Sequence, residues 1–177
     1  EAMPGSPEEK ITTGLDGLPD RLTEYFDIGA RFAKWRAVIT IGENLPTDAN
    51  LLSQSETMAD YALECQNAGI VPIIEPEVLM DGNHPMARCE EVSRKVLITV
   101  FKKIAEKNVY VPGLILKTNM IVPGKESGEK KTRDEIAEAT IHEFNDILPH
   151  NLPGQVFLSG GQSEVEATEN LNAINKR

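Results

Sequence analysis

The stretch Ile70-Val-Pro-Ile-Ile-Glu75 carries the pattern that decides the fold, because it is a short apolar run that ends in a charged side chain. Its apolar residues do not alternate with polar ones, which is typical of a parallel strand buried on both faces. We expect Pro76 to end this strand. A helix opened by the capping box Ser53-Gln-Ser-Glu56 and running to about Ala68 precedes it, and a long helix from about Pro85 to Lys107 follows it.

The same strand–helix unit recurs along the chain, after a predicted loop over residues 1–17 and a first helix over residues 18–29. The polar residues at the strand ends are separated by 41, 42 and 42 positions. Alternation of this kind predicts a parallel α/β sheet. The four predicted strands are Phe32–Ile39, Ile70–Glu75, Leu114–Thr118 and Gln155–Ser159, and their polar end residues are Lys34, Glu75, Lys117 and Ser159.

Active sites of (β/α)8 TIM barrels are built at the C-terminal ends of the strands, where these polar residues are predicted to lie. A complete barrel takes ~250 residues, and the four predicted units fill nearly all of this chain. Helices expected from Thr132 to about Leu148 and from Ser163 onward, each with a capping box, complete the last two units. The simplest interpretation is half a barrel, a single partial TIM-barrel domain over residues 1–177.

Composition narrows the class of protein. The net charge of −10 and the absence of a basic run argue against a nucleic-acid partner. No apolar run approaches the ~18 residues that a membrane helix needs, and no signal peptide opens the chain. The two cysteines, Cys65 and Cys89, fall in predicted helices and are expected to be buried structural thiols. Together these features favour a cytoplasmic protein.

Lys117 follows three apolar residues, so we expect its amine to be partly desolvated, which disfavours the ammonium form. A neutral amine can attack a ketone and form a Schiff base, which then acts as an electron sink. The alternative is a strand-end lysine that only reaches solvent.

Two further pairs of charged side chains are predicted to share a strand face, because they stand two positions apart. Lys34 and Arg36 repel each other unless an anion lies beside them, which suggests that together they form a clamp that binds a phosphate or a carboxylate. Glu75 and Glu77 could supply a general acid/base and a carboxylate that holds a lysine. In both cases the alternative is that these acids and cations satisfy one another as structural ion pairs.

A glycine turn follows the fourth strand. Ser159 and Gly160 stand before Gly161, and glycines let a backbone with exposed N–H groups approach an anion. Plain turn geometry explains the same residues. The three histidines, His84, His142 and His150, show no ligand spacing, so the sequence predicts no metal site and gives them surface or capping roles.

Six stretches spread over the chain form a characteristic set. They are Gly14-Leu-Asp-Gly-Leu18, Phe32-Ala-Lys-Trp-Arg36, Ile70-Val-Pro-Ile-Ile-Glu-Pro-Glu77, Leu116-Lys-Thr-Asn-Met120, Phe157-Leu-Ser-Gly-Gly-Gln-Ser163 and Asn170-Leu-Asn-Ala-Ile-Asn175. The set covers nearly the whole chain, is highly specific, and resembles class I fructose-bisphosphate aldolase.

The resemblance implies a reaction and a role for each site residue. It implies reversible, metal-independent cleavage of fructose 1,6-bisphosphate to dihydroxyacetone phosphate and glyceraldehyde 3-phosphate, without a cofactor, in a homo-oligomer that is commonly a tetramer. The implied roles are the Schiff-base lysine for Lys117, the acid/base for Glu75, an assisting lysine for Lys34, a carboxylate that positions the lysines for Glu77, a contact to the far phosphate for Arg36, and a phosphate-binding loop for Ser159 and Gly160.

By the family pattern this chain holds strands four to seven and lacks functional groups from the other strands. Thr118 stands where many family members have proline. Two hypotheses besides aldolase chemistry therefore remain. The first is another Schiff-base lyase on the same fold, which the amino-acid sequences of the motifs disfavour. The second is a catalytically inactive half-barrel that serves as a fragment or scaffold. Open strand edges would drive such a half-barrel to associate.

Overall fold

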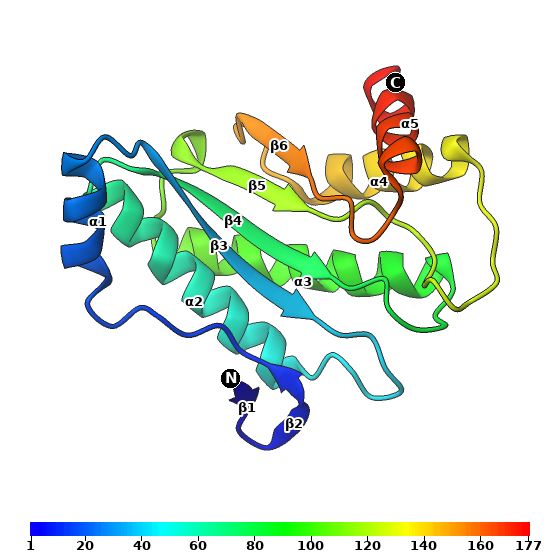
Figure 1. Cartoon of the computed structure of the whole chain (residues 1–177), viewed down its shortest axis with the longest axis horizontal. Coiled ribbons are helices and arrows are strands. Elements are labelled where there is room, and N and C mark those ends of the chain that lie inside the picture. Colours follow the sequence, from blue (N-terminus) through cyan, green and yellow to red (C-terminus); the bar gives the residue numbers. More distant parts are fainter.

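A computed structural model describes all 177 residues, and its centre is a parallel sheet of four strands in the order β3-β4-β5-β6. The strands point the same way in Figure 1, as expected for repeated strand–helix units. Their bounds are β3 Phe32–Ile39, β4 Val71–Val78, β5 Ile115–Thr118 and β6 Gly154–Phe157.

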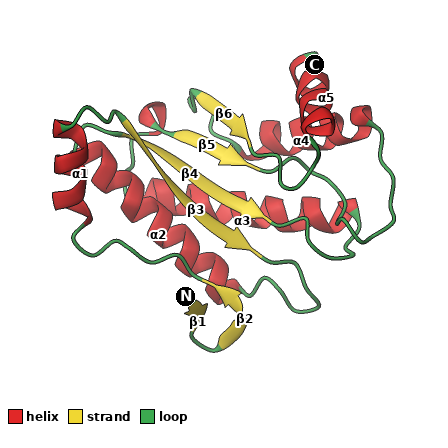
Figure 2. Cartoon of the chain, in the orientation of Figure 1, coloured by secondary structure: helices red, strands yellow, loops and turns green.

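Five helices and one short 3-10 turn connect and cover these strands. Figure 2 shows α2 and α3 behind one face of the sheet, while the opposite face is open toward the viewer. The bounds are α1 Leu18–Asp27, α2 Asp48–Asn67, α3 Met86–Glu106, η1 Val111–Gly113, α4 Arg133–Ile147 and α5 Glu164–Asn175. None of these helices is both long enough and apolar enough to cross a bilayer.

The main hydrophobic core lies between the sheet and its helix layer. A cluster of 26 buried residues includes Ile74 of β4, Met58 of α2 and Val100 of α3, which are all completely enclosed. Trp35 points into this layer, as expected from its place between two cations, and its ring lies 5.0 Å from that of Tyr61. Cys65 and Cys89 are buried free thiols, and burial raises the pKa of each to about 11.

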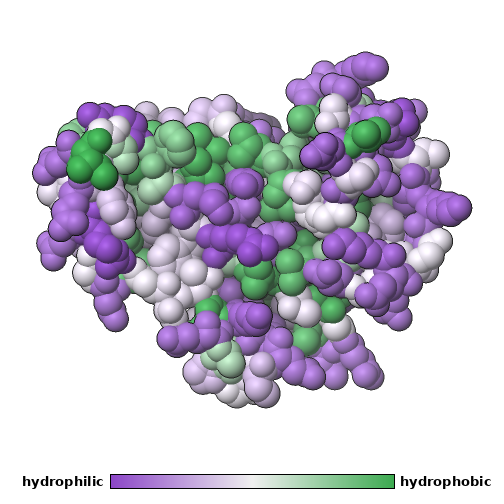
Figure 3. Space-filling view, in the orientation of Figure 1, coloured by the Kyte–Doolittle hydropathy of each residue, from purple (hydrophilic) through white to green (hydrophobic).

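The expectation that the strands are buried on both faces is confirmed for most of β4, which is buried from Ile74 to Val78, and is wrong for β3 and β6. Phe32, Val71 and Val156 remain 68%, 39% and 44% exposed. Each of these residues lies on a strand, so apolar surface is open to solvent there. Figure 3 shows the open face, where hydrophilic surface crosses the middle and hydrophobic surface borders it.

Three predicted boundaries are wrong. Residues 1–17 are not all loop, because β1 (Ala2–Met3) and β2 (Ser6–Lys10) form a small antiparallel hairpin. Helix α2 begins at Asp48 rather than near Ser53: Thr47 caps it by accepting the Asn50 N–H (3.1 Å), and the Glu9 carboxylate accepts the Thr47 N–H (2.9 Å). Strand β4 continues past Pro76 to Val78, because its ladder with β3 is not interrupted there.

Candidate active site

The charged side chains predicted to share a face do meet on the open side of the sheet. Strands β3 and β4 pair in parallel register, with Arg36 opposite Glu75. Side chains of alternate residues point to the same face, so β3 contributes Lys34 and Arg36 and β4 contributes Glu75 and Glu77. Lys117 arrives from β5, which pairs with the other edge of β4.

Glu75 bridges two lysines. Its Oε1 lies 3.1 Å from the Lys117 ammonium, and its Oε2 accepts a short hydrogen bond from the Lys34 ammonium. The Glu75 side chain is 4% exposed, whereas Lys117 and Lys34 are 30% and 42% exposed. A single enclosed carboxylate thus holds two amines that both remain accessible from the open face. This arrangement can pass a proton between the carboxylate and either amine.

Arg36 and Glu77 form a second pair beside the first. Arg36 Nε lies 2.5 Å from Glu77 Oε2, and this hydrogen bond is the main reason that the pKa of Arg36 lies above its ordinary value. Glu77 contacts Arg36 and forms no ion pair with either lysine, so it holds Arg36 in place rather than Lys34 or Lys117. The interpretation that nearby acids satisfy Lys34 and Arg36 is confirmed. It leaves their exposed sides available to a ligand.

The Ser159–Gly160 turn lies at the same end of the sheet, directly after β6. Gly160 and Gly161 both have positive φ angles, of 62° and 93°. The backbone carbonyl of Ser159 accepts two hydrogen bonds from Gln162, while the N–H groups of Ser159, Gly160 and Gly161 donate to no backbone carbonyl. Consecutive free N–H groups in such a turn form an anion-binding concavity. No hydrogen bond or ion pair joins this turn to the lysine–glutamate cluster.

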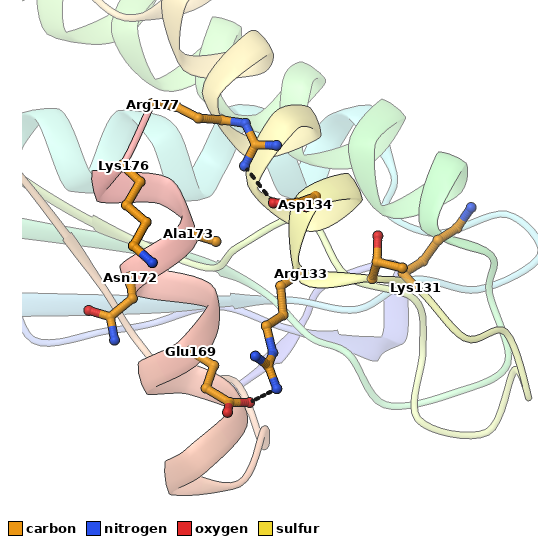
Figure 4. Close-up of a pocket in the computed structure, with 9 residues that line it drawn as sticks. Lys131, Arg133, Asp134, Glu169, Asn172, Ala173, Lys176 and Arg177 are labelled. Carbon is orange, nitrogen blue, oxygen red and sulfur yellow. Dashed lines mark hydrogen bonds and ion pairs between the residues drawn. The ribbon is translucent and has the colours of Figure 1, made fainter.

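Two hollows lie near the C-terminal ends of the later strands. One of about 630 Å³ is lined by the loops that follow β4, β5 and β6, including Met80, Lys125 and Gly161. The other, of about 620 Å³, lies between the start of α4 and α5, as Figure 4 shows. Its ion pairs, Arg133 with Glu169 (2.7 Å) and Arg177 with Asp134 (3.2 Å), satisfy most of its charges. No predicted site residue lines either hollow, so neither is the predicted site.

His84 was expected to have a surface or capping role, and this expectation is wrong. The residue is 6% exposed, because the loop that contains it pairs with the loop after β5, where the Gly124 N–H donates to the His84 carbonyl (2.9 Å). Burial lowers its pKa. No group of three or more histidine, cysteine, aspartate or glutamate side chains is arranged to hold a metal ion.

Three buried polar residues were given no role from the sequence. Thr118 and Asn119 follow Lys117 directly and form hydrogen bonds to β4. Glu143 of α4 is completely enclosed, and neither of its carboxyl oxygens has a hydrogen-bond partner. Its helical spacing from Ile136 and Thr140, both on the buried face of α4, is a signal that could have indicated its burial.

Comparison with known proteins gives a consistent result. The family model described as fructose-bisphosphate aldolase class-I matches residues 1–177. Cytosolic fructose-bisphosphate aldolase 4 of Arabidopsis thaliana is 47% identical over 98% of this chain and 44% of its own length. Fructose-bisphosphate aldolase C of Homo sapiens is also 47% identical, over 98% of this chain and 48% of its own length. The chain therefore spans about half the length of these curated relatives.

A solved structure gives the same fold. The aldolase of Plasmodium falciparum, crystallised with TRAP and a small-molecule inhibitor, superposes with a TM-score of 0.97 at 46% identity, over 99% of this chain and 51% of that one. The parallel sheet, the helix layer and this superposition define an α/β protein with part of a TIM-barrel fold. The family match then assigns it further: the chain belongs to the class I fructose-bisphosphate aldolase family.

Proposed function

We propose that this chain supplies the Schiff-base half of a fructose-bisphosphate aldolase, which cleaves fructose 1,6-bisphosphate reversibly into dihydroxyacetone phosphate and glyceraldehyde 3-phosphate. The observation that carries the proposal is the enclosed Glu75 carboxylate that contacts both Lys117 and Lys34. An amine that attacks a ketone must shed protons, and the carbinolamine that forms must lose water. Both steps need an acid/base within hydrogen-bonding reach of the reacting nitrogen.

Each residue then has a chemical task. The Lys117 amine attacks the ketone carbon and, after loss of water, forms a protonated imine that accepts the electron pair released when the neighbouring carbon–carbon bond breaks. Glu75 moves protons to and from the reacting groups, and the hydrogen bond from Lys34 holds this carboxylate in place. This division of labour requires the 3.1 Å contact between Glu75 and Lys117 to be maintained during turnover.

Two anion sites fit a substrate with a phosphate at each end. Arg36, held by Glu77, offers its remaining guanidinium N–H groups to one phosphate. The free N–H groups of Ser159 and Gly160 suit the other phosphate. The open face carries three cationic side chains and two carboxylates, so its net charge is positive by one, which favours an anionic ligand. The cations are Lys34, Arg36 and Lys117, and the carboxylates are Glu75 and Glu77.

The cellular setting is part of the same proposal. Some relatives are named as cytosolic or cytoplasmic isozymes, and we extend that location to this chain. The sequence resemblance also leads us to propose that the chain assembles into a homo-oligomer and takes a sugar phosphate as its small-molecule ligand. The alternative of an inactive half-barrel makes the opposite prediction in the experiment below.

A chimera tests the function with the rest of a barrel in place. Residues 1–177 replace the matching half of the Plasmodium falciparum aldolase, with which they superpose at a TM-score of 0.97. We expect the chimera to cleave fructose 1,6-bisphosphate in a coupled spectrophotometric assay. Lys117→Met should lower the rate by roughly 10³-fold or more, because the proposed mechanism assigns imine formation to this amine.

The control for this experiment is Lys102→Met, which removes a lysine that is 70% exposed on α3 and should leave the rate unchanged. A folded chimera without activity would contradict the proposed function and favour the inactive half-barrel. Activity that survives Lys117→Met would show that a different lysine forms the imine.

A further inference from the structure

The backbone ladder between β4 and β5 is interrupted next to the lysine–glutamate cluster. The N–H groups of Val71 and Leu79 donate to carbonyls on the β3 side, so odd-numbered amides of β4 face β3 and even-numbered ones face β5. Pro76 is at an even position and has no N–H to donate. Regular pairing of β4 with β5 covers only Ile73 with Ile115 and Ile74 with Leu116.

The side chains of Thr118, the last residue of β5, and of Asn119, which follows it, bridge the gap that Pro76 leaves. Thr118 Oγ1 donates to the Pro76 carbonyl (3.3 Å), and the Val78 N–H donates to Asn119 Oδ1 (3.0 Å). Thr118 and Asn119 are 3% and 4% exposed, so both bonds are shielded from water. They join β4 to β5 one and two residues beyond Lys117, where the backbone ladder has already ended.

Asn119 also ties this junction to the helix layer. Its Nδ2 donates to Ser93 Oγ of α3 (3.2 Å) and to the Met120 carbonyl (3.2 Å). One side chain therefore joins β4, β5 and α3. Without the Asn119 side-chain oxygen, the Val78 N–H would have no acceptor at a residue that is only 3% exposed. Because an unpaired buried donor is costly, we expect the end of β4 to move instead.

We propose that Asn119 is a positioning residue for the lysine–glutamate site, with Thr118 in a supporting role. Asn119 holds the end of β4 against β5, and thereby keeps Glu75 Oε1 3.1 Å from the Lys117 ammonium. The chemical consequence rests on the proposed function, since proton transfer between these two groups requires hydrogen-bonding distance. A displacement of about 1 Å is enough to slow such a reaction by roughly a hundredfold.

The test uses Asn119→Leu, which keeps the size of the side chain and removes all of its hydrogen bonds. Asn119→Asp keeps the oxygen that accepts the Val78 N–H, and Ser93 can turn its hydroxyl to donate. The matched control is Thr140→Val, which removes a completely buried hydroxyl that accepts the Ile121 N–H (3.0 Å), donates to the Ile136 carbonyl and forms no hydrogen bond to β4 or to Asn119.

Two readouts are measured in the chimera. The first is the rate of borohydride trapping of dihydroxyacetone phosphate on Lys117, which needs both a free amine and proton transfer by Glu75. The second is the rate of reductive methylation of Lys117 by formaldehyde and cyanoborohydride at one fixed pH, which needs only a free amine. We expect Asn119→Leu to slow trapping by about tenfold to a hundredfold, while methylation becomes faster, toward the rate in Glu75→Gln, because Glu75 no longer holds the amine.

If trapping and methylation change in opposite directions, Asn119 acts by positioning the two groups. Thr140→Val shows how plain destabilisation changes the same two readouts. Asn119→Asp should recover most of the trapping rate. The proposal is overturned if Asn119→Leu leaves both readouts as they are in the unsubstituted chimera. If Asn119→Leu does not fold, Thr118→Val gives the same test with smaller changes in the same directions.

Failure of the proposed function would look different. In that case dihydroxyacetone phosphate forms no adduct in any variant, including the unsubstituted chimera. The methylation rate does not depend on aldolase activity, so it still decides whether Asn119 sets the contact between Glu75 and Lys117.

Discussion

Replacing Glu75 by glutamine is expected to slow imine formation at Lys117 by about 10²- to 10⁴-fold, the range found when a general acid/base is removed. The amide keeps the shape of the side chain but cannot take a proton from the carbinolamine or return it. The measurement is single-turnover borohydride trapping in the chimera. The substitution also leaves Lys34 and Lys117 without their shared anion, so we expect a modest loss of stability, about 1–2 kcal/mol because both lysines are partly exposed.

The matched variant is Glu77→Gln, which removes the neighbouring carboxylate on the same strand and face. Glu77 contacts Arg36 and neither lysine, so we expect Glu77→Gln to raise KM for the substrate more than it lowers kcat. Equal losses of maximal rate in the two variants would contradict the assignment of proton transfer to Glu75.

The stability of the chain is expected to fall as the pH rises from about 4.5 to about 8, because of Glu143. Burial, with a smaller contribution from Glu90 on α3, raises the pKa of this carboxyl to about 8, while Arg94 acts weakly in the opposite direction. The folded state therefore holds a proton that the unfolded state releases near the ordinary value of 4.5. Between these two values folding takes up a proton, so stability decreases with pH.

The size of this effect follows from the raised pKa. We expect a loss on the order of 3–5 kcal/mol between pH 5 and pH 9, measured by urea unfolding at a series of pH values. Glu143→Gln removes the titrating group and should flatten the curve, whereas Glu138→Gln, on the exposed side of α4, should leave it unchanged. A curve for Glu143→Gln that follows that of the unsubstituted chain would rule out Glu143 as the cause.

Local patterns in the sequence were enough to predict most of the fold. The spacing of Lys34, Glu75 and Lys117 follows from a repeated strand–helix unit, and the structure places all three on one face of the sheet. The capping boxes at Thr132 and Ser163 are confirmed, because each serine or threonine and the glutamate three residues later satisfy each other without help from the rest of the chain.

The errors arose where distant residues decide local structure. The Thr47 cap is supported by Glu9, 38 residues away, while the Ser53 pattern that matches a capping box lies inside the helix. Pro76 was expected to end β4, but its missing N–H faces β5, so the pairing with β3 continues. Which neighbour a given amide faces depends on the order of the strands in the sheet.

The candidate site was predictable in its members but not in its pairings. The shared face of Glu75 and Glu77 follows from a period of two, yet the sequence could not show that Glu75 takes both lysines and Glu77 takes the arginine. That division depends on the stagger between strands. The role of Asn119 was hidden for a similar reason, since its partners Val78 and Ser93 lie 41 and 26 residues away.

Borohydride trapping with dihydroxyacetone phosphate, followed by peptide mapping, tests the central claim most directly. It is carried out on the 177-residue chain and on the chimera, with Lys117→Met as the control for each. We expect a single adduct, on the peptide that contains Lys117, and none after the substitution. An adduct on Lys34, or no adduct on a folded and unsubstituted chimera, would contradict the assignment of Lys117 as the amine that forms the Schiff base.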